Sequence, residues 1–456
     1  MMRTAPPDLP GANSRGEDSP LDRALALLLA GEREAALRWS AAVVQQDASV
    51  SSALILTCRL LADSGRTEAA IEGFTLGVKR AIDTGNLPLA VAAVGDLRAL
   101  NVDVAPLMEE IASAFCAGSS RLADDAAPPP PPLPHDASFQ PLSSFLTGPA
   151  LLSKATGIIH DASIEYDSLA EKSEPPLFSP LPLFSALEKE GLRALIGCFE
   201  MFTVPAGKAV ISEGEEGAEA YIVARGELEV RRTTEEGSLV TLARLNNGAL
   251  FGEMALLSRA PRAASVVACR PSILLVARRD ALELVAEKRP DVGIELAAHC
   301  RRRMVANLVR TSKLLLAVSP QERPALVERF ETCVFEKGDK LIEEGKDTTG
   351  LHLIASGEVA VVGHEDGGES FVIATLPVGE TVGEVALVLR RKANADVVAV
   401  HPTVTLHLPR GEFLGLVREH PAMLAGLYLA AVERDEETSS VLAGSTTAVA
   451  DGFVLL

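Results

Sequence analysis

An arginine and a glutamate nine residues apart are the residues in this chain whose types and spacing are best suited to chemistry. Arg262 has a planar guanidinium that can donate to two oxygens of one phosphate, a contact that is both charge-assisted and geometrically selective. Glu253 can accept a hydrogen bond from a hydroxyl group. The residues that follow it, Met254 to Leu257, can form a short helical turn whose free N–H groups point at an anion. Together they indicate a site for a ligand with a phosphate and a hydroxyl.

The segment that contains these residues occurs twice, at an offset of 131 residues. The first copy, from Phe251 to Val266, reads FGEMALLSRAPRAASV, and the second, from Val382 to Val397, reads VGEVALVLRRKANADV. The offset holds without a gap over residues 199–271 and pairs several glycines with glycines. A repeat in register fixes the domain count independently of any motif, so we expect one domain used twice.

Short alternating or apolar runs separate the matched glycines of each copy. Examples are residues 220–223 and 228–230, with turn signals at residues 236–237 and 367–368. This pattern is typical of many short strands closed into a small barrel or jelly roll. Most of the glycines read as ordinary turn residues, and only Gly252 and Gly383 lie where a ligand would come close.

The first copy resembles the phosphate-binding cassette of cyclic nucleotide-binding domains over its whole length. The resemblance rests on Gly252-Glu253, seven intervening residues, and then Pro-Arg-Ala-Ala-Ser from residue 261. It implies that Arg262 binds the cyclic phosphate and that Glu253 accepts the ribose 2′-hydroxyl. The remaining residues of the implied site are Met254, Ala255, Ala263, Ala264 and Ser265.

The identity of one cassette residue bears on the choice of nucleotide. In relatives that prefer cGMP, the residue after the phosphate arginine tends to be threonine, and here it is Ala263. The resemblance therefore favours cAMP as the ligand, with no prosthetic group. Binding of cGMP stays open because the hydroxyl of Ser265 lies two places further on.

The second copy keeps the acceptor Glu384 but has Ala393 where the first has Arg262. A buried phosphate without its cation would lose about 2 to 5 kcal/mol of binding free energy, and Asp396 would add repulsion. We therefore expect the second barrel to be a ligand-free partner of the first. The alternative is a shifted loop that lets Arg391 or Lys392 replace the missing arginine.

The amino-terminal part resembles tetratricopeptide repeats. Gly31-Glu-Arg-Glu-Ala-Ala-Leu recurs as Gly65-Arg-Thr-Glu-Ala-Ala-Ile, 34 residues later, and a third similar start at Gly85 comes early for that period. We expect the glycines to allow close packing at the turn between paired helices. Such a region offers either a concave surface for an unidentified protein partner or a bundle that only packs or forms a homodimer.

Composition shifts suggest the domain boundaries of an α+β multidomain chain. We predict α-helical hairpins over residues 20–120, a stiff Pro-rich linker over 121–179, the first cyclic nucleotide-binding barrel over 180–310, the second over 311–440, and a tail over 441–456. Within the linker, residues 143–170 suggest a short helix or a docking peptide.

Helical periodicity after the first cassette, over residues 280–316, includes the basic run Arg301 to Arg303. In the family, such helices close over the ligand and one residue caps the purine, but the sequence does not identify that residue. We interpret the three arginines as a solvated helix face, or as a surface for an acidic partner.

The chain shares its sensor domains with two related families but is not expected to have the output segment of either family. Catabolite activator-type transcription factors need a helix-turn-helix domain, and the residues after the second barrel are too few for one. Regulatory subunits of cAMP-dependent protein kinase also have two such domains in tandem, but their linker holds paired arginines, and residues 126–182 contain no arginine. Kinase inhibition is therefore not implied.

Composition excludes several classes of function. A formal charge of −19 without a clustered basic face argues against nucleic-acid binding. The six cysteines are scattered and form no CxxC pair, which indicates a reducing cytoplasm, and no apolar run is long enough to span a membrane.

Three other readings compete with a receptor for a cyclic nucleotide. Both barrels could serve as a ligand-free scaffold, although the intact first cassette argues against this. An enzyme is not expected, because a cupin needs closely spaced histidines and His352 and His364 are twelve apart. A haem sensor would need an axial ligand such as His299 or Cys300, for which a packed role is the stronger interpretation.

Overall fold

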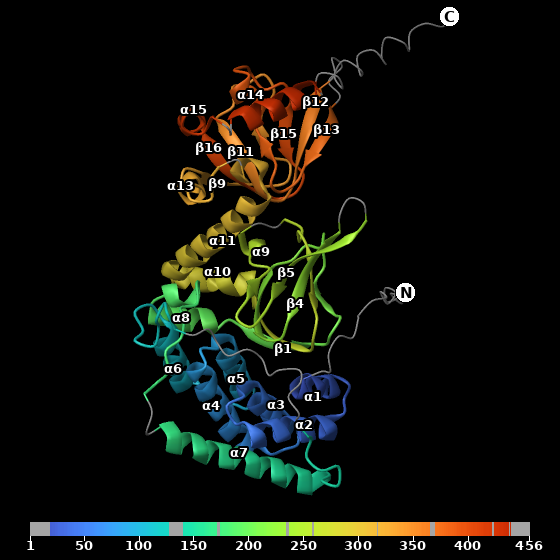
Figure 1. The fold of residues 1–456 in the computed structure, drawn as a ribbon, viewed down its shortest axis with the longest axis vertical. Helices are drawn as coiled ribbons and strands as arrows, with labels where there is room; N and C mark the ends of the chain where they lie inside the picture. Colours follow the sequence, from blue (N-terminus) through green and yellow to red (C-terminus); the bar gives the residue numbers. More distant parts are fainter. Residues whose placement is uncertain are drawn as a thin grey trace, which may run out of the picture. The chain divides into compact units, whose positions relative to one another are not determined.

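The computed structural model of the 456-residue chain groups into two compact units (Figure 1). The first unit holds residues up to 212, 219–251 and 264–295, and the second holds 213–218, 252–263 and the residues from 296 onward. The proline run at 128–132 and the predicted tail at 441–456 lie outside the described residues. The structure describes residues 19–126, 140–170, 174–233, 237–257, 260–316, 318–364, 370–421, 424–436 and 438.

The first unit begins with six helices, which confirms the predicted helical region. They are α1 (Pro20–Leu29), α2 (Arg33–Gln46), α3 (Ser51–Asp63), α4 (Thr67–Asp83), α5 (Leu87–Ala99) and α6 (Ala105–Phe115). Gly31 turns the chain between α1 and α2 with φ of +84°, and Gly65 turns it between α3 and α4 with φ of +77°. A side chain at either glycine would meet no atom within 4 Å, so positive φ, and not the close packing we expected, requires glycine there.

The segment predicted as an extended linker contains a long helix, α7 (Gly148–Ala170). It buries Leu151, Ala155, Ile158, Ile159 and Ala162, which recur at helical spacing, and it packs against α2, α3 and α4 (Figure 1). The expectation of a stiff extended spacer is therefore wrong for these residues, whereas the helix suggested within residues 143–170 is confirmed. Apolar periodicity outweighs the prolines that flank the helix.

Two four-stranded antiparallel sheets complete the first unit together with α8 (Lys189–Ile196) and α10 (Arg279–Lys288). Their strand orders are β1-β8-β3-β6 and β2-β7-β4-β5. The buried core of these strands includes Val223, Leu228 and Leu274, each fully covered. The strands are β1 (Glu200–Val204), β2 (Ala209–Ile211), β3 (Glu219–Arg225), β4 (Leu228–Thr233), β5 (Leu239–Leu245), β6 (Leu250–Phe251), β7 (Ser265–Ala268) and β8 (Ser272–Arg278).

The second unit repeats this topology, and each strand begins and ends 131 residues after its counterpart. Its sheets have the orders β14-β11-β16-β9 and β10-β15-β12-β13. The strands are β9 (Glu331–Phe335), β10 (Lys340–Ile342), β11 (Gly350–Ser356), β12 (Val359–His364), β13 (Ser370–Leu376), β14 (Thr381–Val382), β15 (Asp396–Ala399) and β16 (Thr403–Pro409). The predicted α+β multidomain class with two strand-rich domains and flanking helices is confirmed.

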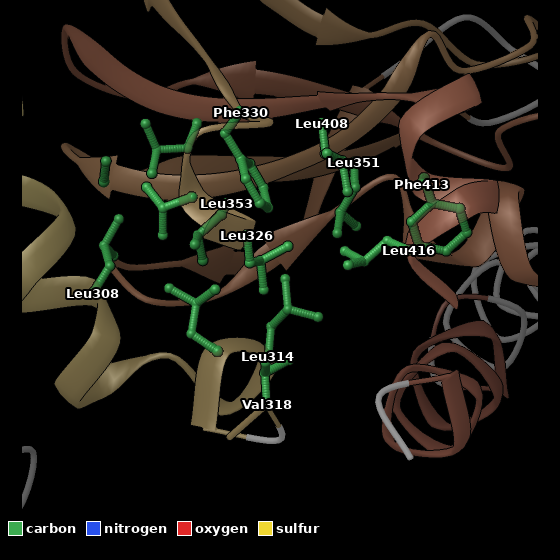
Figure 2. Close-up of a cluster of buried hydrophobic side chains, with 14 of the residues drawn as sticks. Leu308, Leu314, Val318, Leu326, Phe330, Leu351, Leu353, Leu408, Phe413 and Leu416 are labelled. Atoms are coloured by element: carbon green, nitrogen blue, oxygen red, sulfur yellow. The ribbon is translucent and has the colours of Figure 1, made fainter. Parts of the chain in front are cut away.

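Helices pack on one sheet of the second unit and form its largest apolar core. The core draws on α11 (Pro290–Thr311), α12 (Lys313–Leu316), α13 (Arg323–Val327) and α15 (Arg410–Glu419). Figure 2 shows its side chains, among them Leu308, Leu326, Phe330 and Leu353, converging between helix and sheet. Among the described residues, no helix has both the length and the apolar character needed to cross a membrane.

Candidate ligand-binding site

Gly252 turns the chain at the start of the candidate site. Its φ of +74° lies in the left-handed region that favours glycine, and α9 (Met254–Leu257) follows. The N–H of Ala255 donates to the Gly252 carbonyl at 3.2 Å, and the N–H of Leu256 donates to the Glu253 carbonyl at 3.0 Å. The predicted short helical turn is present, but these two N–H groups, which we expected to face an anion, are used inside it.

The backbone and the side chain of Arg262 are both held in place. Its carbonyl accepts from the N–H of Gly214 at 2.8 Å, and its N–H donates to the Glu215 carbonyl at 2.9 Å. Its Nη1 donates to the Gly252 carbonyl at 2.8 Å. A Cβ at Gly217 would lie 2.3 Å from Arg262 Nη2, so a side chain at this position would displace the guanidinium from its present place. Gly217 is a candidate site residue that sequence reasoning missed.

Glu253 is buried, with 3% of its surface exposed, and an arginine from the following helix pairs with it. The Nε of Arg303 donates to Glu253 Oε1 at 3.1 Å. Cys300, one turn earlier on α11, has its Sγ 3.7 Å from the Glu253 carbonyl oxygen, and burial raises the pKa of this thiol to about 12. The acceptor expected for a ribose hydroxyl is therefore ionically paired within the chain.

The basic stretch on α11 has partners within the second unit. Arg303 pairs with Glu253, while Arg301 donates to the Thr332 hydroxyl and to the Phe330 carbonyl, each at 2.7 Å. Both arginines thus have partners within the chain, although the side chain of Arg303 is still 43% exposed, as expected for a solvated helix face. The sequence offered one signal for Arg303, because the 131-residue offset continues past the cassette and matches it with Arg434.

The other predicted site residues differ in their surroundings. Met254 packs against the apolar core of the second unit, and Ala263 is exposed. Ala264 is half-buried, and Ser265 is the first residue of β7, where it pairs with Arg231 of β4. Gly252, Glu253 and Arg262 are the predicted residues that arginine side chains tie together, through Arg262 to Gly252 and through Arg303 to Glu253.

The second cassette keeps the backbone register of the first. The Ala393 carbonyl accepts from the N–H of Gly345 at 2.9 Å, and the N–H of Ala393 donates to the Lys346 carbonyl at 3.0 Å. These bonds match those of Arg262 residue for residue, so the backbone at Ala393 lies in the same register as that at Arg262. Arg391 is therefore not moved into the place of the missing arginine.

Two polar residues of the second cassette replace smaller residues of the first. Thr348 stands at the position of Gly217, and its hydroxyl donates to the backbone within the turn. Asp396, 3% exposed, accepts from Lys340 Nζ at 2.6 Å and lies 2.8 Å from His364 Nε2. Burial acts to raise the pKa of Asp396, but Lys340 and the other donors outweigh it and lower the pKa to about 2. An ionised carboxylate here would repel an anionic ligand.

Glu384 is paired in the same way as its counterpart in the first copy. Arg434 Nη1 donates to Glu384 Oε1 at 2.6 Å and to the Thr381 carbonyl at 2.5 Å, while Nη2 donates to Glu380 at 2.6 Å. Burial raises the pKa of Glu384 although Arg434 opposes the shift. Because Arg434 matches Arg303, a carboxylate–arginine pair between cassette and helix occurs in both copies.

The side chains considered for haem or metal binding have packing roles. His299 is 8% exposed, and burial with the nearby Arg302 lowers its pKa to about 4, while Cys300 is fully buried. His352 Nδ1 lies 3.0 Å from the Thr405 hydroxyl. Within the described ranges, no three His, Cys, Asp or Glu side chains are grouped so that they could hold a metal ion.

Comparisons with known proteins identify the family of the two strand-rich domains. Residues 201–289 and 332–420 each match the family model of the cyclic nucleotide-binding domain. The cAMP-dependent protein kinase regulatory subunit of Yarrowia lipolytica is 32% identical over 241 residues, which cover 52% of this chain and 60% of that protein. The type II regulatory subunit of Drosophila melanogaster is 29% identical over 224 residues, which cover 49% and 56%. The chain thus spans little more than half the length of these relatives.

Solved structures show the same kind of similarity. The regulatory domain of Toxoplasma gondii PKA with cAMP is 25% identical, with a TM-score of 0.28, over 55% of this chain and 92% of that one. The catabolite activator protein of Thermus thermophilus is 31% identical, with a TM-score of 0.26, over 32% and 79%. On the two family matches and the repeated strands, this chain is a protein with two cyclic nucleotide-binding domains in tandem.

Proposed function

We propose that the chain is a receptor for a cyclic nucleotide, with the ligand in the first domain and none in the second. The observation that supports this most is a paired difference between the copies. The first has Arg262 packed against Gly217, and the second has Ala393 in place of the arginine and Thr348 in place of the glycine. A charge-assisted contact to a phosphate is available in one domain only.

The described contacts suggest how cAMP would bind. The donors of Arg262 would turn from the Gly252 carbonyl to the cyclic phosphate, and the 2′-hydroxyl would donate to Glu253 while Arg303 keeps that carboxylate neutralised. Ala263 supports cAMP over cGMP, because it offers no hydroxyl to a guanine. Titration of both nucleotides decides between them.

We infer that the output is a protein contact in the cytoplasm and not catalysis. The relatives are named as regulatory subunits of cAMP-dependent protein kinase, so a kinase catalytic subunit is the first partner to test. The absence of arginine from residues 126–182 argues against an inhibitor segment there, which leaves the helical region as the alternative partner surface. Self-association into a homodimer is a further outcome of the same experiments.

Calorimetry of the full chain with cAMP and with cGMP tests the receptor proposal. We expect one site per chain that favours cAMP, and an affinity roughly thirtyfold to several-thousandfold lower in Arg262→Ala, since a desolvated charge pair is worth about 2 to 5 kcal/mol. Arg244→Ala is the matched control, because Arg244 lies in the same domain with 65% of its side chain exposed. Equal loss in both variants, or no heat with either nucleotide, would contradict the proposal and favour a ligand-free scaffold.

A further inference from the structure

The two copies differ in a second group of residues besides the phosphate arginine. Where the second copy has Arg391, Asn394 and Asp435, the first has Ala260, Ala263 and Met304 at an offset of 131. Asp435 lies 41 positions after Asn394 in the sequence, yet it contacts both Asn394 and Arg391 in the structure. The second copy has therefore gained a contact where it lost a cation.

Asp435 is the centre of this contact. Its Oδ1 accepts from Asn394 Nδ2 at 3.0 Å and pairs with a guanidinium nitrogen of Arg391. Both donors belong to the cassette loop, whereas Asp435 belongs to the helical residues 424–436. The Asp435 side chain is 20% exposed, so water only partly screens the pair. We call Arg391, Asn394 and Asp435 the anion latch.

The preceding residue joins the same helix to the cassette in another way. Arg434 reaches Glu384, Glu380 and the Thr381 carbonyl. This contact has a counterpart in the first copy, where Arg303 meets Glu253. The pair with Glu380 and the anion latch have no such counterpart, because Ala249, Ala260, Ala263 and Met304 stand at the matching positions.

The matching residues of the first copy cannot form such a latch. Ala260 and Ala263 have no polar side-chain atom, and Met304 is 1% exposed within the apolar core. Replacing a core methionine by aspartate costs free energy unless the carboxylate finds donors. In the second domain, Asn394 and Arg391 supply those donors, so the three changes are physically coupled.

We propose that the anion latch takes the place of a ligand in the second domain, with the Asp435 carboxylate as an internal anion that holds helical residues 424–436 on the cassette without any nucleotide. An intramolecular anion is present at a high effective concentration at all times. The second domain is therefore fixed in its closed arrangement, and a nucleotide has no open state to select. This inference does not depend on ligand binding by the first domain.

Hydrogen exchange of the nucleotide-free full chain tests the latch. Asp435→Ala removes the acceptor that Arg391 and Asn394 share. We expect the amides of residues 424–436 to exchange about tenfold to a hundredfold faster, because losing a charge-assisted hydrogen bond raises the equilibrium constant for local opening by about that factor. Glu433→Ala is the matched control, because Glu433 is exposed on the same helical turn. Equal exchange in the two variants would overturn the proposal.

Two further variants test whether Asp435 acts through Asn394 and through its charge. Asn394→Ala combined with Asp435→Ala should speed exchange no more than Asp435→Ala alone, because both changes break one contact. Additive effects would show that Asp435 acts elsewhere. Asp435→Asn preserves the size of the side chain and removes its charge, so it should give an intermediate effect even if the alanine variant folds poorly.

The same measurement separates this proposal from the receptor proposal. In the Arg262→Ala background, where the first domain is expected to be silent, 1 mM cAMP (on the order of the weakest specific affinities) should leave exchange of residues 424–436 unchanged. Protection that rises with cAMP in this background would mean that the second domain takes a ligand. That result would overturn the latch without bearing on the first domain.

Discussion

Asp22 is the buried centre of an ion cluster that ties the helical region to the first pair of sheets. It is 2% exposed on α1 and pairs with Arg225, at the end of β3, and with Arg270, whose Nε donates to it at 2.8 Å. Arg225 also donates to the Pro271 carbonyl at 2.7 Å, and the hydroxyl of Ser19 accepts from the N–H of Asp22 at 3.2 Å. All five residues belong to the first unit. Replacing Asp22 by alanine is therefore expected to weaken the helical region.

The magnitude follows from the charges that the substitution would leave behind. The side chains of Arg225 and Arg270 are only 7% and 11% exposed, so Asp22→Ala strands two buried cations. Removing one partner of a buried ion pair typically costs about 3 to 5 kcal/mol of unfolding free energy. The exposed pair Asp63–Arg33, with side chains 49% and 64% exposed, is worth under about 1 kcal/mol, and Asp63→Ala is the matched control.

The chain has one tryptophan, Trp39, which lies on α2 with the Arg23 guanidinium of α1 5.2 Å from its ring centre. Its fluorescence therefore reports unfolding of the helical region during a urea titration. With a slope of about 1 to 3 kcal/mol per molar urea, Asp22→Ala should lower the midpoint by roughly 1 to 5 M. A shift no larger than that of Asp63→Ala would refute the reasoning.

The pH dependence of this cluster has a definite sign. Burial acts to raise the pKa of Asp22, but Arg225 and Arg270 outweigh it and hold the pKa below its usual value. The stabilisation is then fully present above the unfolded carboxyl pKa of about 3.9 and is lost as the pH falls through the lowered folded value. The difference between Asp22→Ala and the unchanged chain should therefore shrink only in acid.

Three further measurements test the packing of the two units. Burial and the neighbouring His407 lower the pKa of His352 to about 3. Its neutral form therefore stabilises the second unit fully above about pH 6.5 and progressively less below it. The thermal midpoint of unfolding should fall between pH 7.5 and 5.0, and it should fall less in His352→Gln. A Cβ at Gly73 of α4 would lie 2.2 Å from Cys58 Sγ, so Gly73→Ala should cost about 1 to 3 kcal/mol by urea titration. Gly95→Ala, where nothing lies within 4 Å, should instead gain about 0.5 to 1 kcal/mol.

The sequence repeat predicted the fold well because strand bounds follow local pattern. Gly252 and Gly383, matched in the sequence, both have positive φ and open corresponding helical turns. The repeat also located Arg262 and its absence at Ala393, because these residues lie within the gap-free register. Local pattern and register thus sufficed wherever a feature depends on neighbours in the chain.

Features built from distant residues escaped prediction. The Asp22–Arg225 contact joins residues 203 positions apart, and no periodicity signals it. The sequence did suggest a helix within residues 143–170, but it did not show that α7 packs against α2, α3 and α4. Arg303 and Asp435 were missed because partners across a fold depend on where a helix returns to the cassette.

Glu253 and Glu384 bear on what counts as evidence for ligand binding in this fold. Both are buried, and each pairs with an arginine of the following helix, although only the first cassette has the arginine that we expect to bind a phosphate. If the glutamate existed only for a ribose hydroxyl, its burial and pairing in the second domain would have no cause. The pair instead joins cassette and helix in either copy, because a buried carboxylate needs a counter-charge whether or not a ligand is bound. The glutamate alone therefore does not indicate a ligand, whereas Arg262 together with the space at Gly217 does.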